Sequence, residues 1–233
     1  MATYLLLNLV AISIPLILSF DKKVHYYKRW KYLFPAIGIS LIIFIIWDII
    51  FTYKGVWGFN PIHLSGIEII NLPLGEWLFF ITVPYSCVFL YDVFKAYLKK
   101  DPFRYISRPL SFFLMGFLLV FSLLHYDKIY TFTTFLFLAF LIAFLELVFR
   151  VKFMGWFYFA FMIVLIPFLI MNGILTGSFI EEEIVWYNNA ENLSFRVFTI
   201  PIEDFFYGML LILVNVSIYE FLQNRKAKSL TVQ

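Results

Sequence analysis

Apolar stretches of roughly 20 residues, each long enough to cross the hydrocarbon core of a bilayer, recur along the whole chain. With 63% hydrophobic and only 14% charged residues, and a mean hydropathy of +0.88, too little polar surface remains to cover a water-soluble globule. In lipid a helix satisfies its own backbone hydrogen bonds. The sequence therefore predicts an all-α integral membrane protein of about seven transmembrane helices, without a sizeable soluble domain.

The expected spans can be placed on these apolar stretches. They cover residues 4–20, 33–52, 75–94, 109–124, 129–149, 153–173 and 200–222. We interpret the first as a helix and not as a secretory signal, because no basic residue precedes it and residues 21–31 after it are basic and aromatic.

Basic residues are distributed very unevenly between the two sets of helix ends. Of the 18 lysines and arginines, only Lys54, Lys128 and Arg196 fall at the ends that include the N-terminus. The positive-inside rule then predicts an integral protein of the inner cell membrane, with its N-terminus outside and its C-terminus in the cytoplasm. No basic domain is present, so we expect no nucleic-acid partner.

An internal repeat relates the two halves of the chain. Residues 73–79 (PLGEWLF) are echoed by residues 201–207 (PIEDFFY), and Pro201 follows Pro73 by 128 residues. The same offset relates residues 57–60 to 185–188 and residues 91–92 to 219–220. Agreement at three separated places argues against coincidence.

The repeat predicts the domain organisation. Each half would hold three helices, in modules 1–108 and 125–233, and the helix 109–124 would link them. A single linking helix makes both modules run the same way through the membrane, as a parallel repeat. Corresponding residues of the two modules should then lie at the same depth.

Carboxyl groups begin the third helix of each module. Glu76, Glu203 and Asp204 fall in a first turn that follows a proline, where the helix dipole alone would favour an acid. Their repetition in both modules favours a second interpretation, in which they face one central cavity and act as acid or base. Asp48 and Asn172 would either support these acids or cap their own helices.

No motif of the chain indicates a metal or a cofactor. His25, His63 and His125 have no metal-ligand spacing to other candidate ligands, and no glycine-rich turn follows a strand. Aromatic residues make up 22% of the chain, more than interfacial belts require. They would pack the bundle or line an apolar cavity, where their π faces can stabilise a cation.

The repeated motifs, together with residues 55–60 (GVWGFN) and 172–177 (NGILTG), resemble the two modules of the membrane-integral, heterodimer-type lycopene cyclases. In that family the modules occur as two small subunits or fused in one chain. The likeness covers nearly the whole sequence. Its signature is a proline followed by two acids, which is intact at Pro201, whereas the first copy has Gly75 in place of the first acid.

The resemblance implies a lycopene β-cyclase, an isomerase that needs no cofactor. An acid would protonate the linear ψ-ends of lycopene, giving γ-carotene after one ring has closed and β-carotene after both. On this view Glu203 and Asp204 form the acid pair, Glu76 is the base or an electrostatic stabiliser, and Asp48 supports them. The expected substrate-contacting residues are Asn172, Trp77, Phe80, Phe205, Phe206 and Trp47.

The partners implied are lycopene and other linear carotenoids, together with membrane lipid, and a homo-oligomer is left open. A microbial rhodopsin would need a lysine in the seventh helix, and residues 200–222 contain none. The remaining alternative is a carotenoid-binding or small-solute transport protein without catalysis, in which the acids would form a proton or cation path.

Overall fold

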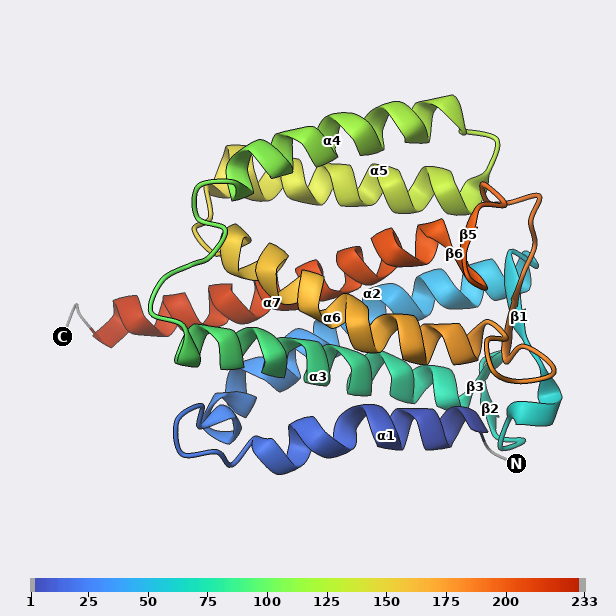
Figure 1. The fold of residues 1–233 in the computed structure, drawn as a ribbon, viewed down its shortest axis with the longest axis horizontal. Coiled ribbons are helices and arrows are strands. Elements are labelled where there is room, and N and C mark those ends of the chain that lie inside the picture. The colour runs from blue at the N-terminus through green and yellow to red at the C-terminus, as the bar shows by residue number, and fades with distance from the viewer. Residues whose placement is uncertain (1–2, 231–233) are drawn as a thin grey trace.

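The protein is described by a computed structural model covering residues 3–230, with side chains for residues 3–225 (Figure 1). Lys226 and Lys228, which the charge pattern assigns to the basic end, have side chains outside this range. Residues 3–230 contain seven α-helices: α1 (Thr3–Leu18), α2 (Trp30–Tyr53), α3 (Leu74–Tyr97), α4 (Ser107–Leu124), α5 (Ile129–Ala143), α6 (Met154–Leu175) and α7 (Ile202–Leu230). Three short helical segments complete the set: Tyr26–Arg29, Pro61–His63 and the π-helical turn Phe144–Phe149, which continues α5.

The predicted all-α membrane fold is confirmed. Within the described residues, six helices are long and apolar enough to cross a membrane, and α1, with 16 residues, is a shorter apolar helix. The last helix begins at Ile202 instead of residue 200, because Ile200–Pro201 pair as a strand. At Pro73 and Pro201 the missing N–H and the fixed φ suit a position beside a helix start.

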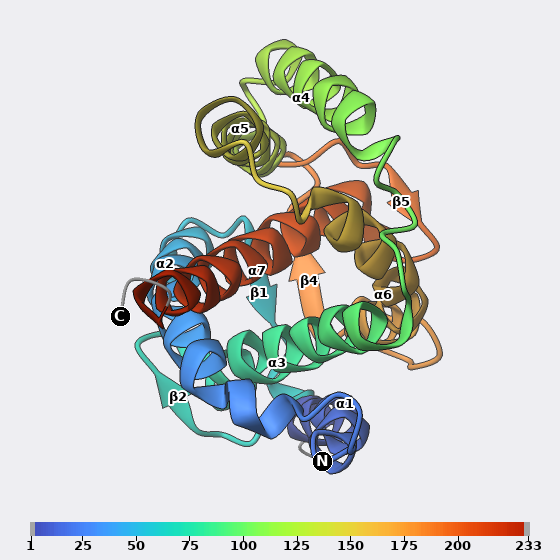
Figure 2. The ribbon, with the colours of Figure 1, turned by 90° about the vertical axis from the view of Figure 1, so that its left-hand side faces the viewer.

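Successive helices run in opposite directions, with the N-terminus at the end that carries the strands and the C-terminus at the other end (Figure 1). Viewed along the bundle, α2, α3, α6 and α7 surround the centre, and strands β1 (Trp57–Phe59) and β4 (Val185–Tyr187) are seen between them (Figure 2). Helix α1 lies beside α3, and α4 lies beside α5 at the outer edge. Helices α1, α2 and α3 run in the same directions as α5, α6 and α7.

Three two-stranded antiparallel ladders lie at the N-terminal end. The hairpins β2 (Glu68–Ile69) with β3 (Leu72–Pro73) and β5 (Arg196–Val197) with β6 (Ile200–Pro201) lead directly into α3 and α7. The third ladder pairs β1 (Trp57–Phe59) with β4 (Val185–Tyr187), so two segments that the repeat relates become hydrogen-bonded neighbours. This ladder joins the two halves of the chain.

The opposite end of the bundle holds a second connection between the halves. Tyr219 donates a hydrogen bond to Asp92, and Tyr91 donates one to Glu220 at 2.6 Å. The two acids also pair with Arg29 and Lys95 respectively. Each tyrosine thus binds the acid of the other half, and we call these two contacts the crossed tyrosine–acid pairs.

Candidate active site

An elongated cavity of about 180 Å³ lies between α1, α3, α6 and α7, beneath the β1–β4 ladder. Its lining residues on each helix recur every three or four positions, as one helix face requires. On α3 they run from Glu76 to Leu90, a distance of roughly 21 Å at 1.5 Å per residue. Most of the wall is apolar, and the three carboxyl groups of Asp48, Glu76 and Asp204 lie at the strand end.

The cavity wall is incompletely covered on α1 and α6. Pro167 of α6 is exposed, and Leu7 and Ala11 of α1 are half-buried although they line the cavity.

Two neighbouring acids come from the first half of the chain. Glu76 accepts a hydrogen bond from the Tyr4 hydroxyl, and Asp48 accepts one from the indole N–H of Trp57. Both acids are buried, and their carboxyl groups interact electrostatically. The second oxygen of Asp48, Oδ2, is buried without a hydrogen-bond partner among the described residues. Two acids in such a position can hold a proton between them.

Tyr4 approaches Glu76 closely because the residue before that acid is a glycine. A Cβ atom added at Gly75 would lie 2.6 Å from Cδ1 of the Tyr4 ring, well inside van der Waals contact. Asn8, one turn after Tyr4, donates to the Gly75 carbonyl at 2.9 Å and fixes α1 against α3. The departure from the two-acid signature therefore makes room for a tyrosine.

The acid of the second half has a different set of partners. Asp204 accepts hydrogen bonds from Tyr130 (2.6 Å), Asn172 (2.7 Å) and Tyr187 (2.9 Å). Burial, followed by the nearby Asp204 carboxyl group, raises the pKa of the Tyr187 hydroxyl well above its ordinary value. Tyr187 is therefore a neutral donor, and three donors around one carboxyl group stabilise its ionised form.

These contacts follow the internal repeat. Tyr4 near the start of α1 and Tyr130 near the start of α5 lie 126 residues apart, two fewer than the offset of the repeat, and each donates to an acid in the first turn of the third helix of its half. Asp48 and Asn172 lie at comparable places on α2 and α6, and Trp57 and Tyr187 are partners in the β1–β4 ladder. The sites are not identical, since one holds two acids and the other holds one acid with three donors.

Glu203 lies on a different face of α7 from Asp204 and does not line the cavity. It is fully buried and accepts hydrogen bonds from the Thr131 hydroxyl (2.6 Å) and the Leu193 backbone N–H (2.7 Å). Successive residues of a helix point about 100° apart, and here Asp204 points into the cavity while Glu203 points towards Thr131. The structure thus brings together Asp48, Glu76, Asp204 and Asn172, but not Glu203.

The aromatic residues expected to contact substrate lie outside the cavity lining. Trp77 donates to the backbone carbonyl of Ile69, and Trp47 and Phe80 pack against Phe44. Phe205 and Phe206 have packing partners of their own, on Phe168 and Phe135 respectively. These residues were expected to contact substrate because they lie close to the acids in the sequence. The helical geometry instead directs their side chains towards other neighbours.

Residues that the sequence analysis did not select line the cavity instead: Tyr4, Trp57, Tyr130, Tyr187 and Tyr207. Helical spacing could have indicated one of them, because Tyr207 lies three residues after Asp204 and so on the same face. The 128-residue offset relates Tyr4 to Phe132, so the repeat did not indicate Tyr130. Tyr187 depends on strand pairing, which the sequence did not reveal.

No group of three or more His, Cys, Asp or Glu within the described residues is arranged to hold a metal ion. The polar chemistry at this end of the cavity is therefore that of carboxyl, phenol, indole and amide groups. Such groups donate and accept protons and hydrogen bonds.

The fold and the cavity together define a class, that of integral membrane proteins with an elongated, largely apolar cavity that has buried acids at one end. A family model described as lycopene cyclase matches residues 1–94 and 127–222, and the unmatched segment between them contains α4. The chain belongs to the lycopene cyclase family, which confirms the resemblance seen in its motifs, and it is accordingly an enzyme of lycopene cyclisation with a carotenoid substrate. No curated protein and no solved structure shows a significant match to the chain.

Proposed function

We propose that the chain is a lycopene β-cyclase, an isomerase that closes ψ-ends to β-rings in the cavity beneath the β1–β4 ladder. The observation that carries the proposal is the placement of Asp48, Glu76 and Asp204 at one end of a largely apolar slot. A linear, water-insoluble polyene fits such a slot, and its terminal double bond would meet the acids.

The reaction requires one proton to be added and another to be removed. An acid protonates C2 of the terminal double bond, and the cation formed at C1 is attacked by the C5–C6 double bond. Loss of the proton on C6 then gives the β-ring, so no electrons are gained or lost and no cofactor is consumed. General acid and base groups in a site that excludes water suffice for these steps.

The two halves of the site suit the two proton transfers. Asp48 and Glu76 are neighbouring carboxyls, which favours retention of a proton, so the pair is the proposed acid. Asp204 accepts three hydrogen bonds that favour the carboxylate, so it is the proposed base. This assignment differs from the roles that the motifs implied, in which Glu203 and Asp204 form the acid pair. Glu203 has no role here, because it binds Thr131 instead of lining the cavity. Glu76 joins the acid pair, and Asp204 becomes the base.

The ring cations formed between these steps would lie against aromatic rings. Trp57 and Tyr130 have ring centroids 5.0 Å apart, and both line the cavity. An aromatic face attracts a cation within about 6 Å, more strongly where water is absent. This wall would also keep water from adding to the cation.

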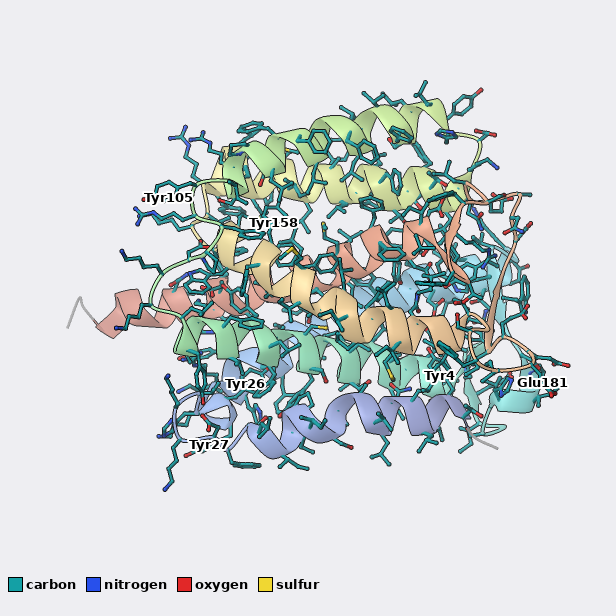
Figure 3. All side chains as sticks on the ribbon, viewed as in Figure 1. Tyr4, Tyr26, Tyr27, Tyr105, Tyr158 and Glu181 are labelled. Atoms are coloured by element: carbon teal, nitrogen blue, oxygen red, sulfur yellow. The ribbon has the colours of Figure 1, made fainter. Side chains whose placement is uncertain are left out.

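The membrane setting of the proposal follows from charge. The C-terminal end carries Arg29, Lys95 and most other basic residues, and Figure 3 shows nitrogen-tipped side chains gathered there near Tyr27 and Tyr105. Figure 3 also shows Tyr4 at the opposite end, where the acids of the cavity lie. On the positive-inside rule the C-terminus is cytoplasmic and the acids face the outer half of the inner membrane.

Pigment analysis of a lycopene-accumulating bacterium that expresses the chain tests the proposal. The native chain should produce γ-carotene and β-carotene. Glu76→Gln and Asp204→Asn should lower the rate by about 10²–10⁴-fold, the range for loss of a general acid or base. Glu203→Gln should retain the reaction wherever the protein accumulates, since Glu203 does not line the cavity.

The matched controls are Glu181→Gln and Asp127→Asn, at exposed positions, which should leave pigment formation unchanged. Unchanged lycopene with a verified native chain in the membrane would refute catalysis and favour the binding or transport alternative. Products with ε-rings would refute only the proposed ring type.

A further inference from the structure

The hydroxyl of Tyr207 is buried without a hydrogen-bond partner among the described residues. The other three tyrosines that line the cavity, Tyr4, Tyr130 and Tyr187, each donate to one of the acids. Because a buried polar group without a partner destabilises a fold, such a group calls for a functional explanation. Phenylalanine would fill the same space without this cost.

The Tyr207 ring packs against residues that bind the acids of both halves. Its ring centroid is 6.1 Å from that of Trp57, which donates to Asp48, and 6.2 Å from that of Tyr130, which donates to Asp204. The phenol also interacts electrostatically with Asp48, Glu76 and Asp204. It lies three residues after Asp204, on the same face of α7, and lines the cavity.

The proposed reaction leaves the site in the wrong protonation state for another cycle. Each ring closure takes a proton from the Asp48–Glu76 pair and delivers the C6 proton to Asp204. A second closure therefore requires one proton to return from Asp204 to the pair. The β1–β4 ladder covers this end of the cavity, so direct exchange of these protons with bulk water is hindered.

We infer that Tyr207 is the proton relay that resets the site after each ring closure, an inference that rests on the proposed function. For this transfer the Tyr207 hydroxyl, which has no hydrogen-bond partner in the part of the chain that the structure describes, comes within hydrogen-bond distance of Asp204 and of the Asp48–Glu76 pair during the cycle. The phenol oxygen accepts the proton from Asp204 while its own proton passes to the pair. Tyr207 begins and ends the transfer as a neutral phenol, Asp204 returns to carboxylate and the pair is recharged. No other reactant is needed.

The test compares Tyr207→Phe with the native chain, purified and supplied with lycopene, in single-turnover and steady-state measurements. The first ring closure per enzyme should keep its native rate, because the acid pair is already charged. Later closures should slow by about 10²-fold, the size of a typical proton-transfer contribution, and a burst should appear. The KM for lycopene should stay the same, since the ring remains.

Thermal unfolding separates this role from a structural one, because loss of an unpaired buried hydroxyl should leave the stability unchanged or raised. Tyr126→Phe, at an exposed position, is the matched control and should behave as native in all measurements. An unchanged steady-state rate in Tyr207→Phe, or equal slowing of the first and later closures, would overturn the relay. A native chain that leaves lycopene unchanged would instead overturn the proposed function itself.

Discussion

At the residue scale, Gly75 shows how one missing side chain shapes the site. It occupies the place that Glu203 has in the second half of the chain, and the space where its Cβ would be is filled by the Tyr4 ring. The hydrogen bond from Tyr4 to Glu76 depends on this close approach. A larger residue must displace either the ring or α1.

Gly75→Ala should therefore lower both stability and activity. Overpacking of this kind costs about 1–3 kcal/mol, and a displaced Tyr4 would no longer donate to Glu76. Thermal unfolding in detergent and pigment formation in cells measure the two effects. Gly116→Ala is the matched control, because a Cβ on this α4 residue meets nothing within 4 Å. Equal behaviour of the two variants would contradict the packing argument.

The acids of the cavity could be named from the sequence, but their roles could not. Glu76 and Asp204 follow repeated prolines, so position and chemistry were readable from the motif. Whether Glu203 or Asp204 enters the cavity depends on the rotation of α7 about its axis, which packing sets. The donors around Asp204 come from α5, α6 and β4, and contacts between such distant segments leave no local signal.

At the scale of elements, the crossed tyrosine–acid pairs hold α3 and α7 together at the end opposite the site. Asp92 is fully buried and Glu220 is nearly so, and each depends on a tyrosine from the other helix. Their sequence pattern, Tyr followed by an acid at both places, was visible as part of the repeat. The crossing was not, because it depends on how the two helices face each other.

Tyr91→Phe and Tyr219→Phe should each destabilise the protein by about 1–3 kcal/mol, since each leaves a buried acid with one donor fewer. Both variants should keep their catalytic rate at low temperature, because the acids of the cavity are not touched. Thermal unfolding with Tyr126→Phe as an exposed control measures the effect. If both variants unfold at the same temperature as the native chain, these hydrogen bonds make no net contribution to the stability of the protein.

At the scale of the whole molecule, the two halves share one site. Asp48 and Glu76 come from the first half, whereas Asp204 and Tyr187 come from the second. The β1–β4 ladder and the crossed tyrosine–acid pairs connect the halves at the two ends of the bundle. The number of helices, the parallel arrangement and a central cavity faced by acids of both halves were predictable from hydropathy and from the repeat, but most of the residues that line the cavity were not.

A chain divided after Ile106, in the segment before α4, should work only as a pair. Co-expression of residues 1–106 with residues 107–233 should restore cyclisation in a lycopene-producing host, because the contacts between the halves do not need the covalent link. Either fragment alone should give no cyclic product. Asp204→Asn in the second fragment provides the negative control. Cyclisation by one fragment alone would refute a site built from both halves.

Asp48 in the first half and Asn172 in the second lie at comparable places, and this difference bears on how such an enzyme can arise by duplication. A duplicated unit that assembles with an identical copy must carry every substitution twice, so it would present two equal acids and no distinct base. Two copies encoded separately in one chain are free to diverge. On the proposed roles, the difference between Asp48 and Asn172 leaves one half of the site with a protonated pair and the other with a single charged acid, and so separates the acid from the base.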